Sequence, residues 1–193
     1  SAIKLLQALP LVESGAADRF GLTPAELALA CASHEGEDAH VQAAASMLSK
    51  AGLDESVLEC GAHWPYNPAA QHALAAAGHE PGALHNNCSG KHAGFVCLGC
   101  VMAGERDPRA FLAGYVEPGH AVMREIDAAI ESTTGCALAS APRAIDGCSI
   151  PTYALPLRRL AHAFARVAGG QGLSPGRATA ARRVRAAVAA APF

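Results

Sequence analysis

The chain has 193 residues, and its 15 Lys and Arg against 17 Asp and Glu give a formal net charge of −2. This near balance argues against a nucleic-acid-binding protein and against a protein that binds membranes through a polybasic surface, since both depend on net positive charge. Hydrophobic residues make up 51% of the chain, which is too many for a disordered protein. We recognise no apolar run of about 18 residues that would predict a membrane-spanning helix, and no signal peptide.

The composition favours helices over strands. The chain holds 45 Ala but only 20 residues of Ile, Val and Thr combined. Ala is the best helix former, whereas β-branched residues favour strands. The seven cysteines are odd in number and scattered along the chain, which indicates reduced thiols and a cytoplasmic protein.

Capping residues, glycines and apolar periodicity predict most elements in chain order. The predicted helices are 3–14 with a break or kink at Pro10, 24–32, 38–50, one from Asn67-Pro68 to Gly78, 89–103, a short one at Asp107-Pro108, 119–132, 153–168, and one from Ser174-Pro175. Residues 142–150 lack a helical period and are the best strand candidate. These elements predict an α+β fold that is mostly helical, with too few strands to cover its apolar helix faces.

Two further patterns are interpreted as structural. Cys97-x-x-Cys100 lies on an apolar predicted helix and has no matching second half, so it is interpreted as a pair of core residues. The last predicted helix carries four arginines, which favour a solvated face over a phosphate site: Arg177, Arg182, Arg183 and Arg185.

The first residues have the form Ser-x-x-Lys, with Ser1 and Lys4 three positions apart. On the first turn of a helix this spacing puts both side chains on one face. A deprotonated Lys4 would take the proton from Ser1 and activate its hydroxyl. The alternative is an ordinary helix start with a solvated lysine. Ser33, in a polar segment between two predicted helices, is either a second hydroxyl for the substrate or the cap of the following helix.

The densest polar cluster is His85-Asn86-Asn87-Cys88-Ser89-Gly90-Lys91-His92. A thiolate beside Lys91 and a helix N-terminus would have a lowered pKa and good metal-binding or nucleophilic character. The two asparagines suit either a helix cap or contacts to a substrate. The alternative for the whole segment is a capped helix start with a buried cysteine.

Asp146-Gly147-Cys148 follows the predicted strand and supplies a second thiol and a carboxylate. Cys88 and Cys148 are therefore candidates to share a zinc ion, for which soft thiolates are suitable ligands. A third ligand would come from one of His85, His92, Asp146 or Lys91.

Together these segments resemble the bacterial asparaginase II family, the Rhizobium-type L-asparaginases. The matching stretches are Ser1 to Pro10, Ala30 to His34, Cys60 to Pro65, His85 to Gly94, and Asp146-Gly147-Cys148 with Pro151-Thr152. The resemblance implies an architecture similar to part of the serine β-lactamases and penicillin-binding proteins. It also implies hydrolysis of L-asparagine to L-aspartate and ammonia.

Carried over onto this sequence, the resemblance implies that Ser1 is the nucleophile, Lys4 its base and Ser33 the second serine. It implies a zinc site whose ligands are Cys88, Lys91 and Cys148. It further implies substrate contacts for three residues: Asp146, His92 and Asn87.

The family pattern has a second catalytic lysine and a final sheet that would lie beyond Phe193. We therefore expect residues 1–193 to be a single incomplete domain with little turnover alone, and a homo-oligomer, such as a dimer, in the full-length form. Two alternatives to an L-asparaginase stay open: a non-catalytic zinc-binding helical module, and a β-lactamase-like acyl-serine enzyme. No nucleic-acid or membrane partner is expected.

Overall fold

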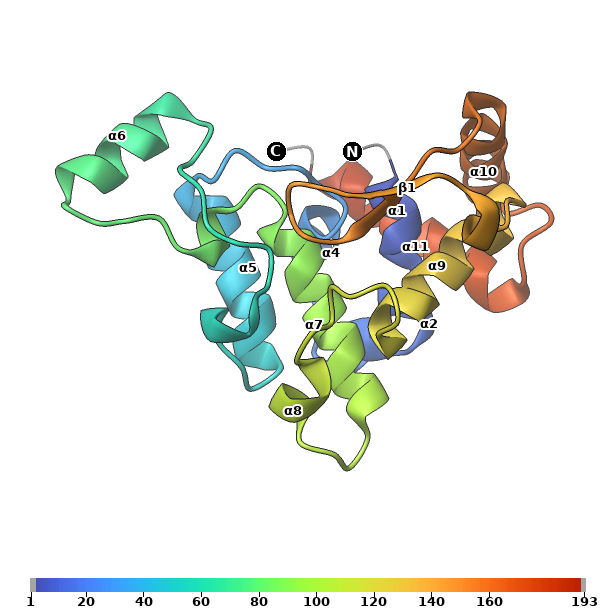
Figure 1. Ribbon diagram of the computed structural model, residues 1–193, viewed down its shortest axis with the longest axis horizontal. Coiled ribbons are helices and arrows are strands. Elements are labelled where there is room, and N and C mark those ends of the chain that lie inside the picture. Colours follow the sequence, from blue (N-terminus) through green and yellow to red (C-terminus); the bar gives the residue numbers. More distant parts are fainter. Residues whose placement is uncertain (1–2, 192–193) are drawn as a thin grey trace.

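A computed structural model describes residues 3–191 of the chain. Its central element is helix α7 (Ser89–Ala103), in which every residue from Ser89 to Cys100 is buried. A helix buried on all sides is typical of the centre of a helical domain. The helices that contact it are α2 (Leu9–Glu13), α3 (Ala16–Arg19), α4 (Pro24–Leu29), α5 (Asp38–Lys50), α8 (Pro108–Leu112) and α9 (Ala121–Thr134) (Figure 1).

A second group of helices packs beside this centre. α11 (Pro175–Ala190) lies against α2 and α4, and α10 (Leu157–Gly169) lies against α9 and α11. The short α1 (Lys4–Gln7) packs on α9. A separate small core joins these elements: Leu6, Leu9, Ala163, Val167, Ala180 and Ala181. α6 (Pro68–Ala76) extends to one side of the molecule, away from α7 (Figure 1).

Most helix ends agree with the sequence signals. Thr23 and Glu26 form the predicted capping box of α4, and Asn67, Asp107 and Ser174 cap α6, α8 and α11. α5 and α7 span the predicted residues. The predicted break near Pro10 is present between α1 and α2, because proline has no N–H to donate to the preceding turn. The structure adds α3 and three 3₁₀ turns, η1 (Glu55–Val57), η2 (Ala83–His85) and η3 (Leu138–Ser140), which were not predicted.

The strand region differs from the prediction. Two strands, β1 (Arg143–Ile145) and β2 (Pro151–Tyr153), pair antiparallel, with Arg143 opposite Tyr153. One continuous strand over 142–150 was therefore wrong, because residues 146–150 form the connecting loop. A helix start at Tyr153 was also wrong, since Tyr153 pairs with Arg143 and α10 begins only after Pro156. α4 ends at Leu29 and not at residue 32. The fold is α+β and predominantly helical, as predicted.

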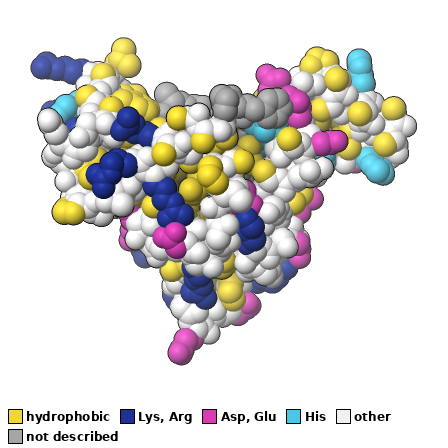
Figure 2. Space-filling model, turned by 180° about the vertical axis from the view of Figure 1, so that it is seen from behind, with side chains coloured by type: hydrophobic (Ala, Val, Ile, Leu, Met, Phe, Trp, Pro, Cys, Tyr) yellow, Lys and Arg dark blue, Asp and Glu magenta, His cyan; other side chains and the backbone are white. Residues whose placement is uncertain are grey.

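Seen from behind, Lys and Arg side chains are spread over the half of the molecule that contains α10 and α11 (Figure 2). Two of the four arginines on α11 form ion pairs, Arg177 with Glu13 at 2.8 Å and Arg183 with Asp18 at 2.7 Å. Arg182 and Arg185 are exposed, as predicted for a solvated face, whereas Arg177 and Arg183 are partly buried in their ion pairs. Among residues 3–191, no helix has the length and apolarity needed to cross a membrane.

Candidate active site and metal centre

The start of α7 is held in place by a buried asparagine. Asn86 Oδ1 accepts a hydrogen bond from the Cys88 N–H at 2.8 Å, and Asn86 Nδ2 donates to the carbonyls of Cys60 and Gly61 at 2.8 and 3.1 Å. Asn86 therefore closes a turn just before α7 and joins two loops, whereas the cap position of α7 belongs to Cys88, which makes no side-chain cap hydrogen bond. These bonds fix the position of the Cys88 thiol at the N-terminal end of the helix.

Lys4 reaches this thiol from α1. Lys4 is 2% exposed, and its Nζ donates to Cys88 Sγ at 3.2 Å and to the Ala32 carbonyl at 2.5 Å. Burial lowers the pKa of Lys4, and the nearby Lys91 cation lowers it further, while Cys88 acts in the opposite direction. The interpretation of Lys4 as an ordinary solvated residue was therefore wrong.

A second lysine and thiol come from α7 and the β-hairpin. Lys91 Nζ donates to Cys148 Sγ at 2.8 Å, and both residues are buried. Asp146 Oδ1 accepts from the Cys148 N–H at 2.9 Å and from its thiol at 3.0 Å, and Asp146 Oδ2 lies 3.9 Å from Lys91 Nζ. The hairpin thus carries a thiol and a carboxylate to the N-terminal end of α7.

The two thiols also meet each other. The Cys88 and Cys148 side chains share a hydrogen bond, which lowers the pKa of Cys88, and the Lys91 and Lys4 cations lower it further, to about 5. The same hydrogen bond and burial raise the pKa of Cys148. One shared contact therefore shifts the two pKa values in opposite directions. Three elements far apart in the sequence therefore meet at one point.

Of the two serines predicted to be catalytic, the structure describes only Ser33. Ser1 lies outside the described residues. Ser33 is exposed and directly follows Ala32, whose carbonyl accepts from Lys4. Ser33 is not the cap of α5, because the cap position of that helix belongs to Glu37. This leaves the substrate-facing interpretation of Ser33 as a prediction.

Lys4, Cys88, Lys91 and Cys148 together form what we call the thiol cluster. Histidines that the sequence did not single out hold the backbone next to it. His63 Nε2 accepts from the Asn87 N–H at 3.0 Å, and the His34 N–H donates to the Asn87 carbonyl at 3.1 Å. His34 Nε2 lies 2.9 Å from Ser89 Oγ, and burial lowers the pKa of His34 to about 3. These two histidines therefore fix the backbone of Asn87 and the first residue of α7. No sequence motif indicated these contacts, which join segments more than 20 residues apart.

His92, a predicted substrate contact, packs against Tyr115 in the core. It is fully buried, with Nδ1 2.6 Å from Tyr115 Oη, and the Tyr115 oxygen accepts from the Glu59 N–H at 3.1 Å. The Tyr115 hydroxyl therefore donates to Nδ1, and the proton of the neutral imidazole is on Nε2, which has no hydrogen-bond partner among the described residues. Burial holds the pKa of His92 well below its usual range. His92 stays near Lys4 and Lys91 as a neutral group.

Four of the other cysteines differ from Cys88 because burial raises their pKa values. Within residues 3–191 all seven cysteines are free thiols. Cys97 and Cys100 are buried in the apolar core, as predicted, and burial raises the pKa of both. Burial likewise raises the pKa of Cys60 and Cys31 to about 12.

A comparison with protein families identifies the family of this chain. The family model for L-asparaginase II matches residues 1–193, the whole chain. The chain belongs to the L-asparaginase II family. No curated protein matches it. Membership of the L-asparaginase II family indicates an asparaginase-type hydrolase with a small-molecule substrate.

The sulfur and nitrogen atoms at the N-terminal end of α7 in this L-asparaginase II chain are suitable in kind to bind a metal ion. Cys88 and Cys148 are in hydrogen-bond contact and Lys91 Nζ lies 2.8 Å from Cys148 Sγ, so two sulfurs and one nitrogen converge. Two thiolates and a neutral nitrogen are a suitable donor set for zinc. Within the described part of the chain, no group of three or more His, Cys, Asp or Glu forms a metal site. Lys91 would therefore have to complete the set.

Proposed function

We propose that this protein hydrolyses L-asparagine to L-aspartate and ammonia, with Ser1 as nucleophile and Lys4 as its base. The observation that carries the proposal is the position of Lys4 Nζ, which is buried and bonded to both Cys88 and the peptide before Ser33. Lys4 is also three residues from Ser1 in the sequence. It therefore links the proposed nucleophile, the second serine and the thiol cluster.

The chemistry follows from these groups. Ser1 Oγ would attack the side-chain amide carbon while Lys4 Nζ takes the hydroxyl proton. When the C–N bond breaks, the same proton would leave with ammonia, and a water molecule would then hydrolyse the ester to release L-aspartate. Backbone N–H groups near Ser33 would stabilise the negative charge that develops on the amide oxygen.

The metal ligands proposed are Cys88, Lys91 and Cys148, with zinc as the ion. A bound zinc ion would supply positive charge that orients the substrate. Asp146 holds the Cys148 backbone and thiol through its Oδ1, so we propose that it positions this ligand and faces the substrate with its other oxygen. Asn87, fixed by His63 and His34, would contribute its side-chain amide to substrate binding, beside the neutral His92.

The test is ammonia release from L-asparagine by the protein expressed from its gene. Lys4→Met should lower kcat by at least about a hundredfold, because removing a general base typically costs 10²–10⁴ in rate. Ser1→Ala should be at least as severe. Lys50→Met is the matched control, since Lys50 is ion-paired with Glu26 and makes no contact with the cluster; its kcat should stay within about twofold of wild type.

A folded Lys4→Met variant with wild-type kcat would refute the proposal. A fluorescent penicillin that labels Ser1, without ammonia release from L-asparagine, would favour an acyl-serine enzyme of the β-lactamase type. Circular dichroism of each variant separates loss of the fold from loss of the base.

A further inference from the structure

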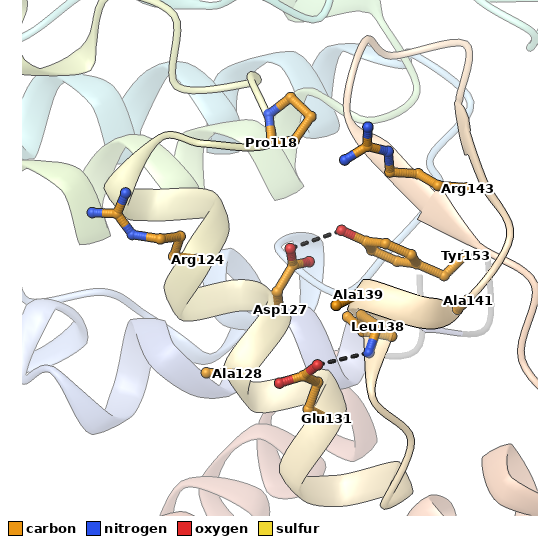
Figure 3. A pocket seen from close by; sticks show the side chains of 10 residues that line it. All are labelled: Pro118, Arg124, Asp127, Ala128, Glu131, Leu138, Ala139, Ala141, Arg143 and Tyr153. Atoms are coloured by element: carbon orange, nitrogen blue, oxygen red, sulfur yellow. Dashed lines mark hydrogen bonds between the residues drawn. The ribbon is translucent and has the colours of Figure 1, made fainter.

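A pocket of about 590 Å³ lies between α9 and the β-hairpin, outside the thiol cluster. Its charged walls face each other: Asp127 and Glu131 come from α9, and Arg143 comes from β1 (Figure 3). Pro118, Leu138 and short alanine side chains form the rest of its lining. This volume is within the range of small-molecule sites.

Each of the two carboxylates that line the pocket accepts a hydrogen bond through only one of its oxygens within the described chain. Tyr153 Oη donates to Asp127 Oδ2 at 2.7 Å, and the Leu138 N–H donates to Glu131 Oε1 at 2.6 Å. Asp127 and Glu131 are four residues apart, so they share one face of the helix. Asp127 Oδ1 and Glu131 Oε2 are therefore acceptors without a described donor, placed on one wall of the pocket.

The opposite wall holds a solvent-exposed cation, Arg143. Arg143 is exposed and is close enough to Asp127 to lower the pKa of its carboxyl, but it makes no ion pair with it among the described residues. Burial is the larger effect on Asp127 and raises its pKa, and the neighbouring Glu131 raises it further. Arg124, also on α9, donates to the Gly119 carbonyl at 2.7 Å, and its guanidinium is turned away from Asp127 (Figure 3).

We propose that this pocket binds a zwitterionic α-amino acid. The guanidinium of Arg143 would pair with the α-carboxylate, for which its planar donors have suitable geometry. The free oxygens of Asp127 and Glu131 would accept from the α-ammonium. Because the ligand carries both charges side by side, it complements both walls, whereas an anion meets two carboxylates and a simple cation meets Arg143.

The position of the pocket links it to the thiol cluster. Arg143 and Tyr153 are directly paired across the hairpin, and the loop that follows β1 carries Asp146 and Cys148. A ligand bridging α9 and β1 would therefore restrain the hairpin that presents Cys148 to Lys91. We expect bound amino acid to slow amide hydrogen exchange over residues 143–153 and in α9.

The test uses three probes of nearly equal size: L-alanine, ethylamine, which lacks the carboxylate, and propionate, which lacks the ammonium. By isothermal titration calorimetry, L-alanine should bind at least tenfold more tightly than either of the other two. Equal binding of ethylamine or propionate would overturn the proposal, whatever the behaviour of any variant.

Substitutions and amide hydrogen exchange test whether the amino acid binds in this pocket. Arg143→Gln and Asp127→Asn should each weaken L-alanine binding at least tenfold, whereas Arg158→Gln, an exposed arginine on α10 outside this pocket, should leave it unchanged. If Arg143→Gln does not fold, hydrogen exchange of the wild type with L-alanine decides the question. Protection at residues 143–153 supports the pocket, and protection confined to residues 85–92 would assign the binding to the thiol cluster and overturn it.

Discussion

Cys88, at the N-terminal end of α7, and Cys97, near the middle of the helix, have pKa values shifted in opposite directions. At the N-terminal end, Cys88 lies beside Lys4 and Lys91, and its pKa is lowered to about 5. Nine residues later, Cys97 is surrounded by apolar side chains, donates to the Met47 carbonyl at 3.6 Å, and has its pKa raised to about 12 by burial. Both thiols are buried, so burial alone does not explain the difference.

The difference lies in where the nearby cations are directed. Cys97 also has a lysine in its neighbourhood, Lys50, but that lysine is bonded to both oxygens of Glu26, at 2.8 and 2.6 Å. Glu26 accepts further bonds from Ser46 Oγ and from the Thr23 N–H, both at 2.7 Å. Near the middle of α7 the charges of Lys50 and Glu26 therefore neutralise each other, whereas at its N-terminal end Lys4 and Lys91 both donate to cysteine sulfurs.

The largest expected contrast between the Cys88 and Cys97 regions is in zinc binding. Cys88→Ser and Cys148→Ser should each lower zinc affinity by more than about a hundredfold, beyond the 10–100-fold loss typical of groups that only support a ligand. Cys97→Ser should keep the wild-type zinc content, because its thiol is in the apolar core. Elemental analysis of purified protein gives zinc per chain. Loss of zinc in Cys97→Ser, with zinc retained in Cys88→Ser, would reverse the assignment.

Substitution of two glycines of α7, Gly90 and Gly99, should change the stability of the protein by different amounts. A Cβ on Gly90 would lie 2.7 Å from the Leu29 carbonyl oxygen, so the backbone of α4 would have to move. A Cβ on Gly99 would meet the Leu112 side chain at 2.4 Å, and that side chain can rotate. We expect Gly90→Ala to reduce the free energy of unfolding by about 3 kcal/mol, as overpacking does.

For Gly99→Ala we expect a net change within about 1 kcal/mol, since the higher helix propensity of alanine offsets part of the strain. Urea denaturation of both variants measures the difference. Equal losses would show that the close approach of α4 to the N-terminal end of α7 has no special role in the fold.

The smallest expected effect is the response of the Glu26 network to acid. Burial alone would raise the pKa of Glu26, but the hydrogen bonds from Lys50, Thr23 and Ser46 outweigh it and lower the pKa. A carboxyl with a lowered folded pKa contributes stability above its unfolded pKa of about 4.3, and this contribution is lost as pH falls through the folded pKa.

Lys50→Met should therefore reduce the free energy of unfolding by about 1 kcal/mol at neutral pH, as loss of a charge-assisted bond does. The difference from wild type should begin to shrink as pH falls below the unfolded pKa of about 4.3, and it should be lost as pH falls through the lower folded pKa of the wild type. Urea denaturation at pH 7 and pH 3 tests this, with Lys50→Arg as the variant that keeps the charge. A difference that grows on acidification would contradict the assigned sign.

Much of the local structure was predictable because it depends on neighbouring residues. The Thr23–Glu26 capping box, the ends of α5 and α7 and the break near Pro10 all follow from caps, glycine and proline. The strand region was less predictable. Strands β1 and β2 are only three residues each, and such short segments show no reliable period.

The residue types of the site were also visible in the sequence. Lys4, Cys88, Lys91 and Cys148 stand in recognisable motifs, and the motif of Cys97 and Cys100 was correctly assigned to the core. The supporting residues were not visible: Asn86 bonds to Cys60, His34 to Ser89, and Tyr115 to both His92 and Glu59. Each of these contacts joins segments separated by more than 20 residues.

The sequence by itself determined the helices, their caps and the set of titratable groups, because these depend on side chains a few positions apart. Only the tertiary structure decided which of these groups have shifted pKa values, and in which direction. Lys4 lies 84 positions from Cys88, and Lys91 lies 57 positions from Cys148. The packing of α1, α7 and the β-hairpin brings these lysines onto the thiols, and the packing of α4 on α5 brings Lys50 onto Glu26 instead. Electrostatic effects on a pKa act over a few ångströms in space, so the fold and not the motif sets them.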